Sequence, residues 1–190
     1  MSSHFTAIYD ACVLYPAPLR SLLMYLALTD LFRARWTNDI HDEWMRNVRK
    51  DYPDITQAQV ENVRDVMNSN VRDCLVIGYE FLIPTLTLPD PDDRHVLAAA
   101  IRVGADVIVT ANLADFPASE LGKYGIEAQH PDEFIMHLID LAPQSVCAAA
   151  KQQRESLKKP PMTVDEFLEA LERQGLAQTV SALRQFAALI

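Results

Sequence analysis

The sequence predicts an α/β protein that is built on a parallel sheet and followed by a helical tail. Two β-prone apolar runs, residues 5–9 and 106–110, alternate with segments whose apolar residues recur at helical spacing. This alternation is typical of parallel strands that are connected by helices. After Pro143 the strand signals stop, and the pattern is helical to the end of the chain.

The first half of the sequence predicts two strands and four helices. Residues 5–9 are expected to form a strand that ends at Asp10, and residues 75–79 a second strand. Asn38 or Asp39 can cap the helix that carries Glu43. Helices are expected over residues 19–28, 31–36, 38–50 and 57–68, the last of them opened by Thr56, and a proline-rich loop is expected over residues 84–91.

The second half predicts a central strand and the helical tail. Gly104 ends a helix over residues 95–103, and DVIVT at residues 106–110 is typical of a central parallel strand. A short strand is expected near residues 126–129. Further helices are expected from Ser119 and over residues 131–141, 144–157, 163–172 and 177–189, with a KKPP linker at 158–161. We therefore expect a domain over residues 1–142 and a helical C-terminal tail over residues 143–190.

Composition limits the class of protein. The N-terminus lacks a signal-peptide pattern and no apolar stretch is long enough to span a membrane, so we expect a cytoplasmic protein without a membrane contact. Cys12, Cys74 and Cys147 are scattered, which predicts core residues rather than disulfides or a zinc site. The net charge of −9 opposes nucleic-acid binding through a basic surface, but two divalent cations would bring it to −5.

Four acids are placed where a parallel sheet binds its ligands. Asp10 follows the first strand and Asp115 lies in the loop after DVIVT, so both are expected beyond the carboxyl ends of strands. Asp93 at a helix start and Glu43 within a helix can reach the same edge. Four oxygen ligands suit a hard cation such as Mg²⁺ or Mn²⁺. Each acid also has an ordinary interpretation, since Asp near a helix start usually caps it and Glu is common on helix surfaces.

These acids lie in motifs that resemble the PIN-domain family, and among its members the VapC-type toxin ribonucleases of bacterial toxin–antitoxin pairs. The motifs are IYDACVLYP around Asp10, NDIHDEW around Glu43, DPDDRHVLAAAI at residues 90–101 and VIVTANLADFP at residues 107–117. The resemblance implies a three-layer α/β/α fold and ligation of Mg²⁺ or Mn²⁺ by Asp10, Glu43, Asp93 and Asp115. It also implies RNA cleavage by water and an antitoxin protein as partner.

Two positions depart from the family pattern or leave it open. Asn112 stands where some relatives carry Asp, and it offers a carbonyl oxygen without a charge. Asp92 and Asp93 are adjacent, and we prefer Asp93 because the LAAA stretch then begins four residues later. Asp90 is left to cap the helix or to support a ligand. Thr110, at the end of its strand, can orient a carboxylate or a water, or it is simply a β-branched strand residue.

Other roles follow from charge and from exposed apolar positions. Arg46 and Arg49, with Lys50, can meet the RNA backbone or can be solvated helix residues. The apolar helix at residues 19–28 and the last helices predict a homodimer or an antitoxin surface. Two alternatives to a nuclease remain. A phosphatase of the haloacid-dehalogenase type needs a second Asp where this chain has Cys12, and a non-catalytic module would bind RNA or protein without cutting.

Overall fold

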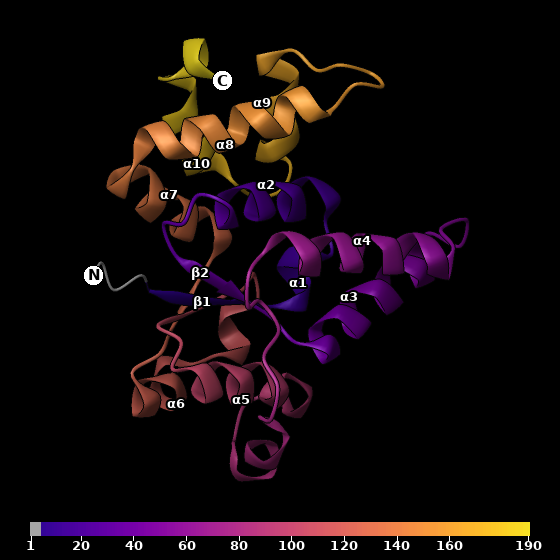
Figure 1. Cartoon of the computed structure of the whole chain (residues 1–190). Coiled ribbons are helices and arrows are strands. Elements are labelled where there is room, and N and C mark those ends of the chain that lie inside the picture. The colour runs from indigo at the N-terminus through magenta and orange to yellow at the C-terminus, as the bar shows by residue number, and fades with distance from the viewer. Residues whose placement is uncertain (1–4) are drawn as a thin grey trace. The chain divides into compact units, whose positions relative to one another are not determined.

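The computed structural model describes residues 5–190 and contains a four-stranded parallel sheet (Figure 1). Its strands, in the order β2-β1-β3-β4, are β1 (Thr6–Tyr9), β2 (Arg33–Arg35), β3 (Val107–Val109) and β4 (Glu127–Gln129). Ile8 of β1 pairs with Arg35 on one side and with Ile108 on the other. The predicted fold class, a three-layer α/β/α fold with a central parallel sheet and a C-terminal helical extension, is confirmed by this sheet and by the helices around and after it.

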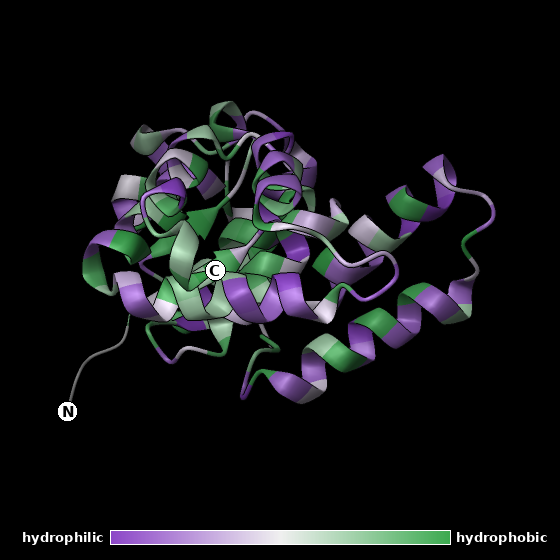
Figure 2. Cartoon of the chain, turned by 90° about the horizontal axis from the view of Figure 1, so that it is seen from above, coloured by the Kyte–Doolittle hydropathy of each residue, from purple (hydrophilic) through white to green (hydrophobic). Residues whose placement is uncertain are grey.

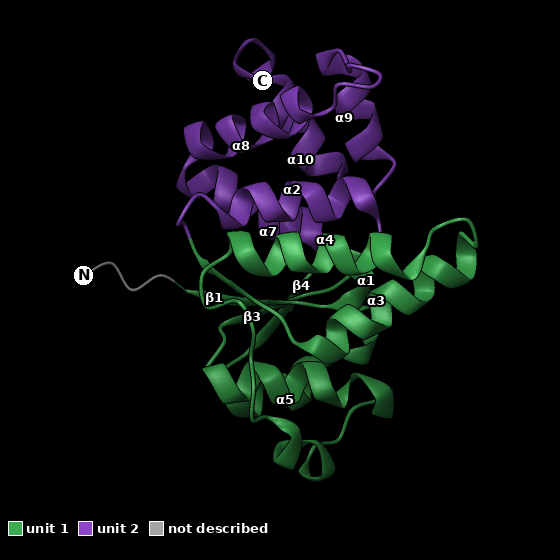
Figure 3. Ribbon diagram, turned by 45° about the vertical axis from the view of Figure 1, so that its right-hand side comes forward, with its two compact units in different colours: residues 1–15, 32–130 green, residues 16–31, 131–190 purple. Residues whose placement is uncertain are grey.

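The chain divides into two compact units (Figure 3). One contains the described part of residues 1–15 together with residues 32–130, and the other contains residues 16–31 and 131–190. The sheet belongs entirely to the first unit. The two units are defined by contacts between segments. The predicted boundary at residue 142 instead concerns which segments fold independently, and it stays a prediction.

In the first unit, small side chains bring one helix close to the sheet. Its α-helices are α1 (Ala11–Leu14), α3 (Asn38–Asp51), α4 (Gln57–Asn70), α5 (Arg94–Val103) and α6 (Ala118–Leu121). Helix α5 packs against β1 and β3 through a buried run that includes Ala98, Ala99 and Ala100. Gly104 ends α5 with a positive φ of 59°, which glycine adopts without the strain of a Cβ atom. Because β3 begins soon after this turn and packs along α5, the start of α5 lies at the carboxyl end of the sheet.

A buried polar network joins α3 to α4. Asn68 Oδ1 accepts a hydrogen bond from Trp36 Nε1 at 2.8 Å and lies 3.0 Å from His41 Nε2. Trp44 Nε1 donates to His41 Nδ1 at 3.0 Å, and burial lowers the pKa of His41. The ring of Trp36 also stacks on Tyr9, at the end of β1. Trp36, His41 and Trp44 are buried and Asn68 is partly buried, so loss of Asn68 would leave buried partners without a hydrogen bond. The network therefore fixes the α3–α4 pair.

The second unit is helical. It comprises α2 (Ala17–Ala27), α7 (Pro131–Leu141), α8 (Pro143–Ser156), α9 (Val164–Glu172) and α10 (Ala177–Arg184). Helix α8 packs against α2 and α7, and α10 packs against α7 and α9. The buried Asp132 carboxylate accepts hydrogen bonds from the backbone N–H groups of Gln178 and Thr179, so it caps α10 from α7. Figure 2 shows the resulting mixture of hydrophobic and hydrophilic positions along the helices.

Leu28 and Leu189, at the ends of the segments behind the homodimer prediction, are exposed, but the leucines within those helices are buried in the single chain. Leu22 and Leu26 of α2, and Leu168 and Leu171 of α9, are all inaccessible to solvent. They therefore give no support to a dimer, which stays a prediction. Within residues 5–190, no helix has both the length and the apolar character needed to cross a membrane.

Several local predictions are wrong. Residues 33–35 form strand β2 rather than part of a helix, because pairing with β1 outweighs local preference. In the predicted strand at residues 75–79, only Leu75 forms a bridge, with Trp36, and Gly78 turns the chain with a φ of 69°. Helix α3 is capped by Thr37 rather than by Asn38 or Asp39, and α10 ends at Arg184 rather than at residue 189.

The described residues also form short 3₁₀ helices: η1 (Glu80–Thr85), η2 (Pro91–Asp93), η3 (Leu113–Asp115), η4 (Gly122–Tyr124) and η5 (Ala187–Leu189).

Candidate functional site

Asp10 is buried at the carboxyl end of β1. Its side chain is held by three donors: the backbone N–H of Ala11 bonds Oδ1 at 2.6 Å, and Thr110 Oγ1 and Cys12 Sγ bond Oδ2 at 2.8 and 3.1 Å. Burial raises the pKa of Asp10, and the hydrogen bonds from Cys12 and Thr110 work against this rise. The carboxylate is thus costly to bury but is positioned by bonds that favour its charged form.

Cys12 is part of this arrangement, which the sequence did not indicate. It is half-buried and lies 3.4 Å from Thr110 Oγ1, while its sulfur accepts a hydrogen bond from the backbone N–H of Ala111. Burial, followed by the charge of Asp10, raises the pKa of Cys12 to about 12, so the thiol stays protonated and can donate to Asp10. The prediction of core cysteines is confirmed for Cys74 and Cys147, which are buried, and is wrong for Cys12.

Asp93 lies at the start of α5 and is surrounded by other acids. Burial, followed by the charges of Asp10, Asp90, Asp115 and Glu43 in that order of influence, raises the pKa of Asp93 to about 7. Its side chain makes no capping hydrogen bond to α5. Asp10 and Asp115 follow the adjacent parallel strands β1 and β3, and Glu43 contacts His95 on the first turn of α5, so these acids lie at the same edge of the first unit as Asp93. Asp90 caps η2 instead, through a 2.8 Å bond from the backbone N–H of Asp92.

Glu43 is paired with a histidine. His95 Nε2 lies 3.4 Å from Glu43 Oε2, and both side chains are partly buried. Burial works to lower the pKa of His95, but the hydrogen bond and charge of Glu43, with Asp39 and Asp10, outweigh it and raise that pKa. His95 Nδ1 is buried and makes no hydrogen bond within the described residues. The sequence signal for His95 was its position two residues after Asp93, on the first turn of the same helix.

Asp115 and Asn112 lie in the turn that follows β3. Asp115 is partly buried at the end of η3, and its backbone N–H donates to the carbonyl of Asn112. The backbone N–H of Asn112 donates to Thr110 Oγ1 at 3.0 Å. Thr110 therefore links the turn of Asp115 to the carboxylate of Asp10. Since β1 and β3 are adjacent and parallel, both turns lie at the same edge of the sheet.

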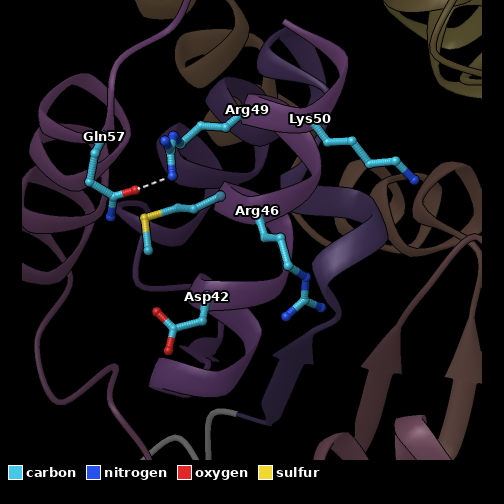
Figure 4. Close-up of a pocket in the computed structure, with 6 residues that line it drawn as sticks. Asp42, Arg46, Arg49, Lys50 and Gln57 are labelled. Carbon is cyan, nitrogen blue, oxygen red and sulfur yellow. Dashed lines mark hydrogen bonds between the residues drawn. The ribbon is translucent and has the colours of Figure 1, made fainter. Parts of the chain in front are cut away.

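The predicted basic residues lie beside this edge rather than within it. Arg46 and Arg49 are exposed on α3, where they line a pocket with residues of the same helix and of α4 (Figure 4). Arg49 Nη1 donates to Gln57 Oε1 at 2.8 Å. Neither arginine has an ion pair with any carboxylate of the described residues.

The carboxylate oxygens of the four acids are the type of ligand that a hard cation prefers, but two of these side chains bond to other protein groups. Across residues 5–190, no group of three or more His, Cys, Asp or Glu is arranged so that it could hold a metal ion. The contacts explain this, since Asp10 is engaged by three donors and Glu43 by His95. The residues nevertheless fit a hard cation in chemistry, since their donors are carboxylate oxygens and a cation there would relieve the repulsion that raises the pKa of Asp93.

Comparison with known proteins identifies the class to which this fold and acidic edge belong. A family model described as PIN domain matches residues 6–114, more than half of the chain, and the chain belongs to the PIN-domain family. A model of the VapC50 C-terminal domain matches residues 131–185. The predicted resemblance to the PIN-domain family and its VapC-type members is thereby confirmed.

One curated relative comes from Mycobacterium tuberculosis (strain ATCC 25618 / H37Rv), where it is described as "Putative ribonuclease VapC50". The chain is 42% identical to it over 109 residues, which cover 57% of this chain and 64% of the relative. The match thus spans less than two thirds of that protein. No solved structure matches the chain.

Proposed function

We propose that this protein is a ribonuclease that hydrolyses RNA phosphodiester bonds with the help of Mg²⁺ or Mn²⁺, and that it is the toxin of a type II toxin–antitoxin pair. The observation that carries the proposal is the acidic edge itself: Asp10 and Asp115 follow adjacent parallel strands, and Asp93 stands at the start of α5. The raised pKa of Asp93 agrees with this crowding of acids. Membership of the PIN-domain family and the likeness to a protein described as a ribonuclease support it.

Asp10, Glu43, Asp93 and Asp115 are the residues proposed to hold the ion. When bound, such an ion supplies a water of lowered pKa and stabilises the leaving oxygen. Thr110 keeps the Asp10 carboxylate in place through its 2.8 Å bond, and Cys12 contributes a second, weaker donor. Asp90 and Asn112 act through neighbouring backbone groups, as a helix cap and as a turn residue. These contacts position the acids, which is the main task left to the protein when a metal performs the chemistry.

The proposed partners are an RNA substrate, which implies a cytoplasmic site of action, and an antitoxin. Arg46 and Arg49 are proposed to bind the RNA backbone. A homodimer is a further proposal, and light scattering at high protein concentration tests it, because a monomer there would rule it out.

The test of the function is metal-dependent RNA cleavage by the whole chain and by Asp10→Asn. The wild type is expected to cut a single-stranded RNA with Mg²⁺ or Mn²⁺ and to stop when the ion is chelated. Asp10→Asn keeps the shape of the side chain, and we expect it to lose about 100-fold or more of the rate. Asp54→Asn, a change at an exposed acid outside the site, is the matched control and should cut normally.

Thermal unfolding with Mn²⁺ separates metal binding from catalysis. At a concentration of about 100 times the dissociation constant, a bound ion adds about 2.7 kcal/mol to the free energy of unfolding. The melting temperature of the wild type should therefore rise by about 5–10 °C, and that of Asp10→Asn by much less. Cleavage by Asp10→Asn at the wild-type rate, or hydrolysis of a phosphomonoester in place of RNA, would contradict the proposal.

A further inference from the structure

A basic pocket lies between α3 and α4, in the first unit. It has a volume of about 310 Å³ and opens to solvent. Its lining consists of Asp42, Met45, Arg46, Arg49, Lys50 and Gln57 (Figure 4). Only Met45 is an apolar residue, so the pocket suits a polar ligand.

Three of these residues carry positive charges that no acid neutralises. Arg46, Arg49 and Lys50 form no ion pair within 4.0 Å in residues 5–190, although the whole chain has a net charge of −9. In a protein with an excess of acids, cations without an ion pair on adjacent turns of one helix attract an anion to this face. Arg49 points toward Gln57, whereas Lys50 points away from it (Figure 4) and contributes only at longer range. The ligand of this pocket is therefore expected to be negatively charged.

The pocket is also held in shape before any ligand binds. Gln57 Oε1 accepts from Arg49, and Gln57 Nε2 donates to Glu61 Oε1 at 2.7 Å, so the guanidinium of Arg49 is oriented from α4. The buried network around Asn68 fixes α3 against α4. Ordering these helices costs nothing further at binding, which favours affinity.

The position of the pocket relates it to the acidic edge. On α3, Arg46, Arg49 and Lys50 lie about 60°, 120° and 20° around the helix axis from Glu43, at about 4.5, 9 and 10.5 Å along it. A strand of RNA that places one phosphate at the acids can therefore place a neighbouring phosphate at these cations. The planar guanidinium groups of Arg46 and Arg49 suit phosphate oxygens, to which they can donate in pairs.

Asp42 adds a feature that a simple phosphate pocket would lack. Its exposed carboxylate lines the same pocket, where it repels phosphate but can accept a hydrogen bond from a hydroxyl group. A ribose carries such a donor, the 2′-hydroxyl, next to each phosphate, and deoxyribose does not. One acceptor beside two phosphate-binding arginines therefore matches one ribonucleotide.

We propose that the α3–α4 pocket binds one ribonucleotide of the RNA strand outside the bond that is cut. Arg46 and Arg49 hold its phosphate, Lys50 adds charge, and Asp42 accepts from its 2′-hydroxyl. This inference rests on the proposed function, since it assumes that RNA is the ligand of the acidic edge. An acidic protein segment fits less well, because the pocket offers only Met45 as an apolar anchor and Asp42 would repel a carboxylate.

The test is binding of a single-stranded RNA of mixed sequence to the full chain in EDTA, where no cleavage occurs. Fluorescence anisotropy is measured over a range of salt concentrations for the wild type and for Arg46→Ala/Arg49→Ala. The double variant should bind about tenfold more weakly, and its slope of log K against log salt should be shallower by about 0.7, because the protein neutralises one phosphate fewer. Both arginines are exposed, so the variant should fold, which circular dichroism checks.

Two controls match these changes. Arg72→Ala/Lys151→Ala removes the same charge from other exposed positions and should leave the affinity within about twofold. The affinity of Asp42→Ala is measured for RNA and for DNA of the same sequence. Loss of the negative charge strengthens the binding of both nucleic acids, so this effect cancels in the ratio of the two affinities. The preference for RNA over DNA should fall about tenfold in Asp42→Ala and stay unchanged in Asp54→Ala.

The outcomes distinguish this inference from the proposed function. If the wild type cuts RNA but Arg46→Ala/Arg49→Ala binds and cuts as the wild type does, the pocket is not a ribonucleotide site, although the function stands. If the double variant loses RNA binding while the wild type cuts no RNA, the pocket stands and the nuclease proposal fails. An unchanged RNA preference in Asp42→Ala overturns the role of Asp42. If Arg46→Ala/Arg49→Ala binds a glutamate-rich peptide more weakly than the wild type does but binds RNA equally well, the ligand of the pocket is a protein segment instead.

Discussion

Replacement of Thr110 by valine should weaken the fold and the acidic edge together. The Thr110 hydroxyl is inaccessible to solvent and donates at 2.8 Å to a carboxylate that is only 3% exposed, so water cannot replace it. A hydrogen bond to a charged group contributes about 1.5–3 kcal/mol, and Thr110→Val keeps the shape of the side chain. We therefore expect the free energy of unfolding to fall by about 2–3 kcal/mol. The backbone N–H of Asn112 also loses its acceptor, but this residue is exposed and water can take over.

Urea unfolding at pH 7, followed by circular dichroism, measures this loss. The same substitution in the Asp10→Asn background should cost only about 1 kcal/mol, because the acceptor is then neutral. The difference, a coupling of about 1–2 kcal/mol, assigns the effect to this pair. Thr85→Val, which removes an exposed hydroxyl bonded to the Leu82 carbonyl, is the control and should change stability by about 0.5 kcal/mol or less. An equal loss in both backgrounds would refute the reasoning.

The other predictions concern a second carboxyl at the edge and a helix cap. The pKa of Asp93 is raised to about 7 from 3.8, so its ionisation opposes folding, and the stability that it contributes is lost as pH rises from about 4 to 7. In EDTA, Asp93→Asn should remove about 1–2 kcal/mol of the pH dependence of the free energy of unfolding, after allowance for solvent screening. Asp92→Asn is the control and should leave this dependence in place. Identical pH curves for the wild type and both variants would disprove the assignment. Asp132→Ala removes the carboxylate that caps α10 and should lower the free energy of unfolding by about 1–2 kcal/mol in urea titrations. Glu133→Ala, at an exposed neighbour, is its control, and an equal effect of the two changes would count against the cap.

The features that the sequence predicted correctly have strong local signals. The buried strand that ends at Asp10, the DVIVT strand and the helix ended by Gly104 all combine an apolar pattern with a clear boundary residue. The capping boxes at Thr56 and Thr163 likewise mark the starts of α4 and α9. In each case, the information lies within a few residues of the element.

The features that it missed depend on contacts between distant residues. Strand β2 reads Arg-Ala-Arg and has no β-branched residue, so only its pairing with β1 makes it a strand. The contact of His95 with Glu43 joins positions that are 52 residues apart in the sequence, and the bond that Arg49 donates to Gln57 crosses between two helices. The sequence named the four acids, but the side chains that contact Asp10 and Glu43 follow from the fold.

The strand order has a consequence for synthesis of the protein. The hydroxyl that holds the Asp10 carboxylate comes from a residue 100 positions later in the chain, and β1 has no partner on that side until β3 arrives. A growing chain on the ribosome therefore carries Asp10 and Glu43 long before Asp93, Thr110 and Asp115 are made. An unfinished chain cannot assemble the edge, so the proposed cleavage of RNA would become possible only after translation has passed Asp115.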